Sequence, residues 1–258
     1  MGLLAVAAMP PQAPSDPPLT EERAVRASPP RRGACLLDAP VLDGGGHALG
    51  RLWDLIVAGD GGVTALVQSR ERGLVGVPLA LLEWRPDPAR PATAGRAVLR
   101  VSADTLLRSP TLVSDDAVDG EWLRRLHAYY GSAPTTPDAD ATPGPSAPLS
   151  LRRLAGAPAD DTAGRPCGEV LDLAVDTAGS RVAYLLLGVG TGGHRGRRVH
   201  GVAWPALMPS RHPDRVTLTV SRAELDASPG LDLDPLPRRP DVAVPLARTR
   251  TSPREDTP

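Results

Sequence analysis

The chain has 258 residues, which is room for two domains of ordinary size, and its formal net charge of -1 argues against a general polyanion-binding protein. Its 29 positively charged side chains are all arginines, which indicates the codon bias of a GC-rich bacterial genome and not selection for nucleic acid. A hydrophobic content of 41% and a charged content of 23% are typical of a folded soluble protein, and the 30 prolines and 26 glycines predict many turns or unstructured segments.

Residues 1–30 are rich in Pro, Ala and Arg without any period, which predicts a disordered N-terminal segment. The opening "MGLLAVAAMPPQAPSD" has an apolar run of signal-peptide character, with an A-x-A pattern at Ala5 and Ala7. It lacks a basic n-region, however, and the run is at the short limit of about 7 residues. We therefore expect a cytoplasmic protein. No segment approaches the ~20 apolar residues of a membrane-spanning helix, so we expect no transmembrane segment.

Residues 31–112 are predicted to form a first small β-domain. The stretch "HALGRLWDLIVAGDGGVTALVQS" has the pattern of a strand, a glycine-rich turn and a second strand, and "GLVGVPLALL" and "AVLRVS" predict further strands. A short helix then follows, for which the Ser102 hydroxyl is a suitable N-cap. Leu106 is predicted to face the core one turn later, and Pro110 to end the helix.

Residues 113–131 contain "DGEWLRRLHAYYG", which predicts an amphipathic helix capped by Asp119 and ended by Gly131. Its apolar face consists of Trp122, Leu126 and Tyr129 or Tyr130. One interpretation is that this helix docks on the first domain and extends its core. The other is that it binds a partner protein in a groove.

Residues 132–148, which include "SAPTTPDADATPGPSAP", have the composition of a Pro-rich linker. Residues 149–231 repeat the first domain in the same order, and "VSRAELDASP" at 220–229 keeps the skeleton of "VSADTLLRSP" at 101–110. Here Ser221 and Glu224 form an S-x-x-E capping box. Residues 232–258 balance acidic and basic side chains among prolines, which predicts a disordered, solvated tail.

Both alternate sets of side chains in "RVAYLLLGV" (181–189) are apolar, as in a strand covered on two sides. Since the sequence offers few helices to cover a far face, a sheet curled into a small barrel is predicted. We therefore expect a mainly β protein with two tandem small barrels and short helices.

The order "G-x-x-x-D-L-x-V", turn, "V-x-x-L", then a "G-V-P" or "G-V-A-W-P" strand and a closing "V-S-x-x-x-L-x-x-S-P" resembles the PRC-barrel family, in two copies. The resemblance covers residues 33–112 and 150–231. That family includes the soluble domain of the photosynthetic reaction-centre H subunit and the C-terminal domain of a ribosome maturation factor. The resemblance implies compact β-barrels that hold partners, and it carries no shared catalytic residues.

The sequence "GVGTGG" at 188–193 matches G-x-G-x-x-G after a predicted strand. The sequence that follows it is strand-like, so no helix N-terminus is expected to bind a pyrophosphate. We interpret this segment as a hairpin tip and expect no dinucleotide.

The same loop contains the densest positive cluster of the chain, which consists of His194, Arg195, Arg197, Arg198 and His200. Arginines could bind the phosphates of RNA or of a lipid head group, or an acidic protein face, through bidentate contacts. The alternative is an exposed, solvated loop. The two histidines lack a third ligand at metal-type spacing, so no metal site is predicted.

Cys35 and Cys167 are too few for a disulfide framework, and we expect each to be a small buried apolar residue. Asp54 and Asp172 occupy matching strand positions, and a local hydrogen bond to a turn within each domain explains them better than a catalytic pair. The sequence contains no catalytic motif, so neither a catalytic residue nor a cofactor is predicted.

We therefore expect a non-catalytic adaptor that presents its loops to a protein partner. The first alternative is an RNA- or ribosome-associated factor that uses the arginine-rich loop. The second is a small-ligand binder or an enzyme of unrecognised type.

Overall fold

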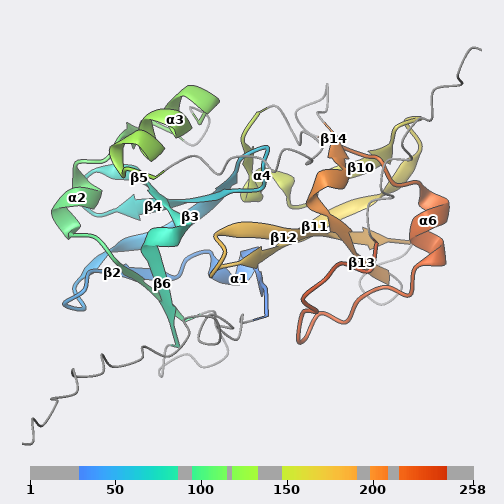
Figure 1. Cartoon of the computed structure of the whole chain (residues 1–258), viewed down its shortest axis with the longest axis horizontal. Coiled ribbons are helices and arrows are strands. Elements are labelled where there is room, and N and C mark those ends of the chain that lie inside the picture. Colours follow the sequence, from blue (N-terminus) through green and yellow to red (C-terminus); the bar gives the residue numbers. More distant parts are fainter. Residues whose placement is uncertain are drawn as a thin grey trace, which may run out of the picture.

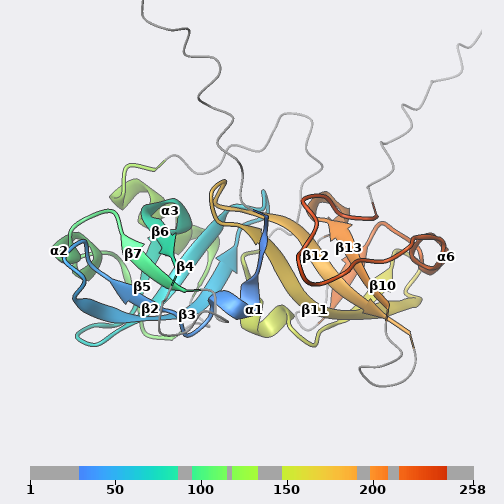
Figure 2. The ribbon, with the colours of Figure 1, turned by 90° about the horizontal axis from the view of Figure 1, so that it is seen from below.

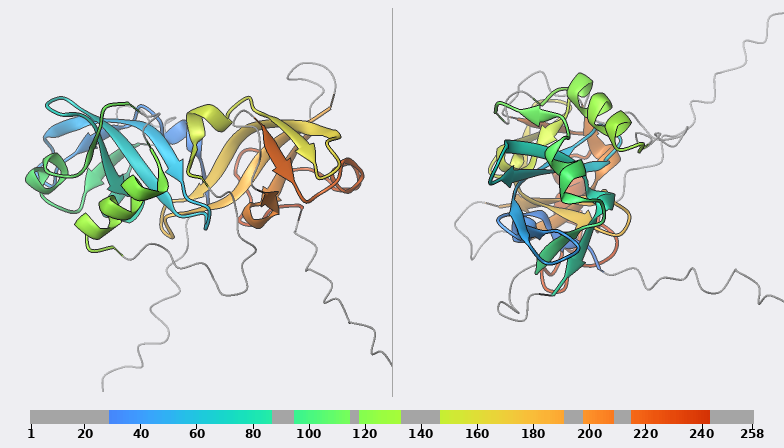
Figure 3. Two further views of the ribbon diagram at one scale, coloured as in Figure 1. Left: turned by 90° about the horizontal axis from the view of Figure 1, so that it is seen from above. Right: turned by 90° about the vertical axis from the view of Figure 1, so that its left-hand side faces the viewer.

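The computed structural model describes residues 29–86, 95–114, 118–132, 147–190, 198–208 and 215–242. Within these ranges the protein is mainly β, with two sheets and few helices (Figure 1). The two sheets lie side by side along the long axis of the molecule (Figure 3). We call them the first half (β2 to β8) and the second half (β10 to β15).

The strands are β1 (Arg31–Arg32), β2 (Pro40–Leu42), β3 (Ala48–Val57), β4 (Val63–Ser69), β5 (Gly73–Pro78), β6 (Leu82–Arg85), β7 (Arg96–Leu99), β8 (Thr111–Leu112), β9 (Leu149–Ser150), β10 (Pro158–Asp161), β11 (Pro166–Asp176), β12 (Arg181–Val189), β13 (Arg198–Ala203), β14 (Leu207–Met208) and β15 (Val216–Leu218). The helices are α1 (Gly33–Leu36), α2 (Ala103–Leu107), α3 (Gly120–Tyr129), α4 (Leu151–Leu154) and α6 (Arg222–Ala227), with 3₁₀ turns η1 (Leu79–Leu81) and η3 (Trp204–Ala206).

The two sheets have the same topology, as the sequence repeat predicts. The first half runs β6-β7-β2-β3-β4-β5-β8, and the second runs β14-β15-β10-β11-β12-β13. Each contains one parallel pair at the equivalent place, β2 with β7 and β10 with β15. No strand pairing among the described residues closes either sheet, so the structure shows two sheets, and the two barrels stay a prediction.

A single apolar core extends through both halves. It includes Leu55 and Val67 from the first half and Leu185 and Leu187 from the second. We call the side of each sheet that faces this core its inner face. The opposite, outer face of each sheet forms a separate apolar cluster. The prediction that residues 181–189 are covered on both sides is confirmed, although the sequence did not indicate what covers the outer face.

The repeated Ser-to-Pro motif is confirmed as helix punctuation in both halves. The Ser102 hydroxyl accepts a hydrogen bond from the amide of Thr105 at 3.0 Å, at the start of α2. At the start of α6, Ser221 and Glu224 form the predicted capping box. Leu106 and Leu225 are both fully buried, so each short helix is attached to the core one turn after its cap.

The two halves exchange their first elements, which the sequence did not predict. The first of these, β1, pairs with β11 in the second half, and β9, which begins the second repeat, pairs with β3 in the first half. Both pairings are two residues long, and α1 and α4 follow them directly. These helices lie between the two sheets (Figures 1 and 2). They meet at Gly33, where an added Cβ would lie 2.7 Å from Leu151 Cδ2.

The segment that follows α6 lies against the second half, although the sequence predicted a disordered tail from residue 232. Leu236 and Val242 are buried there, and Val242 forms a parallel bridge with Val202 of β13. Residues 243–258 lie outside the described residues, as do residues 1–28 and most of the predicted linker. In the part of the chain that the structure describes, no helix has the length and apolar character needed to cross a bilayer.

Candidate functional site

The predicted arginine-rich loop falls largely outside the described residues, since the structure describes none of 191–197. His194, Arg195 and Arg197 belong to that stretch. Arg198 is the first residue of β13 and is exposed. Its guanidinium Nη1 donates to the Ser228 carbonyl at 3.4 Å, just after α6. The base of this hairpin therefore lies beside α6.

His200 does not belong to an exposed cluster. Its side chain is 1% exposed, and its Nδ1 lies 3.0 Å from Asp241 Oδ2. The same carboxylate accepts hydrogen bonds from the amide of Gly201 at 2.6 Å, the hydroxyl of Ser228 at 2.7 Å and the amide of Gly230 at 2.9 Å. His200 thus holds the segment after α6 in place and is not available on the surface.

The hairpin between β4 and β5 is the counterpart of the arginine-rich loop in the first half. Arg70, Glu71 and Arg72 form its tip, and all three are exposed. The guanidinium of Arg72 donates to the Leu107 carbonyl at the end of α2, as Arg198 does to the residue after α6. The helices α2 and α6 lie at opposite ends of the molecule (Figures 1 and 2). We call these two hairpins the arginine hairpins.

An exposed aromatic ring accompanies the first arginine hairpin. Tyr129, at the end of α3, is 41% exposed, and its hydroxyl donates to the Thr105 carbonyl in α2 at 2.8 Å. Arg72 contacts the same helix two residues later. The first end of the molecule therefore presents arginines and a tyrosine around α2.

The other residues of the predicted partner helix are turned toward the first half. Trp122 is 3% exposed and Leu126 is fully buried, and both pack on the outer face against Leu66 and Leu74. Tyr130 is partly buried; its hydroxyl donates to the Gly76 carbonyl at 3.1 Å, and burial raises its pKa to about 12. The helix thus extends the core of the first half, which is the first of the two interpretations.

Asp54 and Asp172 do not bond to turns of their own domains. Asp54 accepts hydrogen bonds from the Ser150 hydroxyl and, at 3.2 Å, from the amide of Arg152 at the start of α4. Asp172 accepts from the amide of Ala34 in α1 at 2.9 Å and from Arg32 Nε at 3.1 Å. Each carboxylate is fully buried and binds the first elements of the other repeat.

Burial raises the pKa of both carboxyls, and the hydrogen bonds that they accept oppose this shift. Each aspartate also lies at a register shift in its strand, which directs its side chain toward the exchanged segment. This pair is therefore a structural link between the halves.

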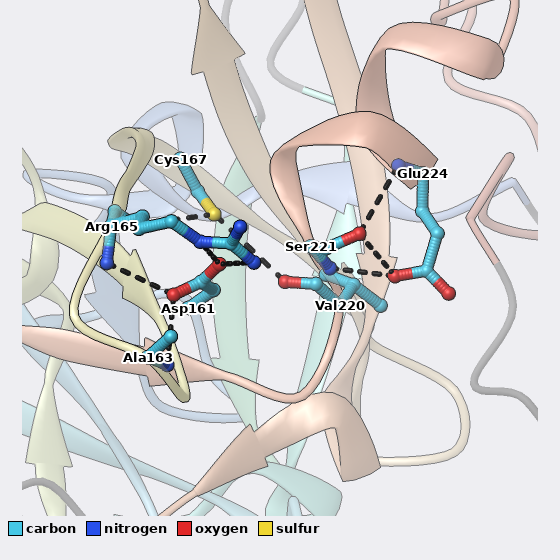
Figure 4. Close-up of polar contacts among 7 residues, drawn as sticks. All are labelled: Asp161, Ala163, Arg165, Cys167, Val220, Ser221 and Glu224. Carbon is cyan, nitrogen blue, oxygen red and sulfur yellow. Dashed lines mark hydrogen bonds and ion pairs between the residues drawn. The ribbon is translucent and has the colours of Figure 1, made fainter.

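The two cysteines differ in their environments. Cys167 is fully buried, as predicted, and its thiol lies 3.8 Å from the Val220 carbonyl (Figure 4). Burial raises the pKa of this thiol. The prediction is wrong for Cys35, which is exposed in α1. Figure 4 also shows Asp161, which accepts from the Ala163 amide and from both the amide and the side chain of Arg165, so this carboxylate is occupied by its own turn.

Among the described ranges, no group of three or more His, Cys, Asp or Glu side chains is arranged to hold a metal ion. Comparison with protein-family models found no match, and comparison with curated proteins found none either. The arginine hairpins are therefore the candidate site that the geometry itself provides.

Proposed function

We propose that the protein is a non-catalytic adaptor of PRC-barrel type, which binds an acidic face of a protein partner through its two arginine hairpins. The observation that carries this proposal is their placement. Among the described residues, Arg70 and Arg72 are exposed at one end of the body and Arg198 at the other, and the two halves share a single core. A partner with two acidic sites could engage both hairpins, and two linked weak contacts then give a much higher overall affinity than either alone.

The buried carboxylates stabilise the fold itself and are fully engaged in hydrogen bonds, which supports a binding role over a catalytic one. Asp54, Asp172 and Asp241 each accept several hydrogen bonds from the backbone or from side chains nearby. Exposed arginines are suited to carboxylates and phosphates, because the guanidinium group presents its donors as a planar fork.

The second candidate is RNA binding, which the tyrosine beside the first arginine hairpin favours. Tyr129 is 41% exposed and contacts α2, as Arg72 does, and stacking of a base on an aromatic ring contributes about 1–3 kcal/mol. RNA binding also predicts a strong loss of affinity with salt, because each neutralised phosphate releases counterions.

The test is affinity capture of the tagged full chain from the lysate of its own cells, with and without nuclease. The variants are Arg70→Glu with Arg72→Glu, and Arg195→Glu with Arg197→Glu and Arg198→Glu. The matched control is Arg124→Glu with Arg125→Glu, which reverses two exposed charges on the solvent side of α3.

The adaptor proposal expects specific proteins that survive nuclease and are lost in both hairpin variants but not in the control. Loss of the same proteins with nuclease supports the RNA alternative. Unchanged capture by both hairpin variants excludes the arginine hairpins as the binding site.

A further inference from the structure

The outer faces of the two sheets are equivalent surfaces with different covers. In the first half, Ile56, Leu66 and Leu74 lie beneath three side chains of α3, namely Trp122, Leu123 and Leu126. In the second half, Ala174, Tyr184 and Leu186 lie beneath residues 231–242, which we call the strap. Leu236 is the strap residue buried in that cluster, and Leu231 and Leu233 are partly buried against it.

The register of the strands shows that the two faces correspond. Asp54 is opposite Leu66 and Asp172 is opposite Leu186, and the next strand places Gly76 opposite Leu66 and Gly201 opposite Leu186. Both glycines allow a close approach by the cover. An added Cβ at Gly76 would lie 2.5 Å from Trp122 Cη2, and one at Gly201 would lie 2.6 Å from Leu231 Cδ1. The outer face of each half therefore has a glycine at the equivalent position, where a covering segment packs closely against the sheet.

The strap is attached by polar contacts and by a few apolar side chains. The Tyr184 hydroxyl donates to the Pro237 carbonyl at 2.6 Å, and the Asp241 carboxylate receives the four contacts described above. Leu236 is buried on the outer face, and Val242 is buried in the shared core. Apart from the bridge at Val242, the strap forms no strand or helix. Segments without regular structure open at lower free-energy cost than the central strands of a sheet.

The four groups around Asp241, two in β13 and two just after α6, would lose their acceptor if the strap left. Three of them are donors, the amides of Gly201 and Gly230 and the Ser228 hydroxyl, and the fourth is the His200 ring nitrogen. Buried donors without an acceptor are costly, so an incoming ligand has to bring an acceptor. A carboxylate meets this need, because it is the group that these four atoms hold now.

We infer that the outer face of the second half is a docking site for an acidic amphipathic helix of a partner protein, and that the strap is its displaceable cover. The helix packs on the outer face of the second half as α3 packs on that of the first half. Its apolar ridge replaces Leu236, and an Asp or Glu beside that ridge replaces Asp241. This site adjoins the second arginine hairpin, since Arg198 donates to the Ser228 carbonyl, but it is a different surface and goes beyond the proposed function.

The probe is a fluorescent synthetic peptide with the sequence of residues 118–132, in which Arg124→Glu and Arg125→Glu make the helix acidic. A second peptide carries Trp122→Ala and Leu126→Ala in addition and serves as the matched control. Both are titrated by fluorescence anisotropy into the purified full chain, into its Asp241→Ala variant and into its Tyr184→Phe variant. Each protein variant removes one attachment of the strap, and Tyr184→Phe keeps the aromatic ring of the face.

The acidic peptide is expected to bind the Asp241→Ala variant about tenfold more tightly than the wild-type chain, because a competing cover no longer has to be displaced. Tyr184→Phe is expected to increase the affinity in the same direction by a smaller factor. In the wild-type chain, bound peptide should speed hydrogen exchange at residues 231–242.

No binding to either variant, while hydrogen exchange shows β11 and β12 still protected, would overturn the inference. So would equal binding of the control peptide, since the affinity would then owe nothing to the apolar ridge. If Asp241→Ala unfolds the second half, Tyr184→Phe alone decides. Because the titration contains no lysate partner, its failure leaves the arginine hairpins unaffected, and failure of the capture experiment leaves this site unaffected.

Discussion

Asp54, in the first half, accepts a hydrogen bond from the hydroxyl of Ser150, which begins the second repeat. Asp172 makes the reverse contact with the first repeat through Arg32 and Ala34. Reciprocal contacts of this kind are what a two-fold axis produces between identical subunits, where each patch contacts its own equivalent. The repeat is therefore a fused pair in which each half holds the first strand and helix of the other.

Removing either carboxylate should destabilise the whole chain and not only one half. Asp54→Ala leaves the Ser150 hydroxyl and the Arg152 amide without their acceptor, and Asp172→Ala does the same to Ala34 and Arg32. A buried donor left without its acceptor costs about 1–3 kcal/mol, and each variant leaves more than one such donor. In urea denaturation, both sheets should unfold together at a lower urea concentration than in the wild-type chain.

The control for these variants is Asp104→Ala, which removes an exposed ion pair with Arg108. Its expected cost is about 0–1 kcal/mol. A loss of similarly small size for Asp54→Ala would contradict the linking role of the carboxylate.

The contribution of the two buried carboxyls, Asp54 and Asp172, to the free energy of unfolding should change with pH. Their pKa values are raised above the ordinary 3.8 by burial, so between 3.8 and the raised value the folded chain keeps protons that the unfolded chain has released. Their contribution to stability is therefore complete below pH 3.8 and is lost as the pH rises through the raised values. Asn cannot ionise, so the stability of the Asp54→Asn, Asp172→Asn double variant relative to wild type should rise with pH from 3.8 upward.

This comparison has to be a difference between two proteins, because other carboxyls act in the opposite direction. Hydrogen bonds lower the pKa of Asp43, Asp161 and Glu224, and their stabilising contribution is lost as the pH falls. These groups are present in both proteins and cancel in the difference. A difference that does not change with pH would show that burial does not govern the two aspartates.

The sequence was sufficient to predict the repeat, the strand order and the capped helices, because those features depend on local patterns. Ser102 and Ser221 show this, since a cap needs only neighbouring amides. The exchange of β1 and β9 could not be predicted, because a two-residue strand has no periodicity to recognise.

The strap was missed for a different reason. Its prolines and balanced charges have the composition of a disordered tail, and only the packed structure shows Leu236 and Asp241 in contact with the second half. In the candidate site, the contact of Arg72 with the end of α2 and the similar contact of Arg198 with the end of α6 required the packed structure.

The two helix caps should differ in strength, which the repeat allows to be measured within one protein. Ser102→Ala removes one hydrogen bond to the Thr105 amide and should cost about 1 kcal/mol. Ser221→Ala also breaks a capping box with Glu224, so its cost should be larger. Thermal and urea unfolding would measure both values. Equal losses would indicate that the contact from the Glu224 carboxylate to the Ser221 amide persists without the hydroxyl.

Gly76 should tolerate a single methyl group poorly, because α3 packs directly on it. An added Cβ would lie 2.5 Å from Trp122 Cη2 and 2.8 Å from Leu126 Cδ2, so Gly76→Ala has to push α3 away from the sheet. Overpacking of this kind costs about 1–3 kcal/mol, and increased Trp122 solvent exposure should accompany it as a red shift of tryptophan fluorescence. Gly120→Ala is the matched control, because the nearest atom to its added Cβ is the flexible end of Arg124 at 4.0 Å. If both variants are equally stable, α3 is not packed on the sheet as closely as Gly76 requires, and its apolar face would be free for a partner after all.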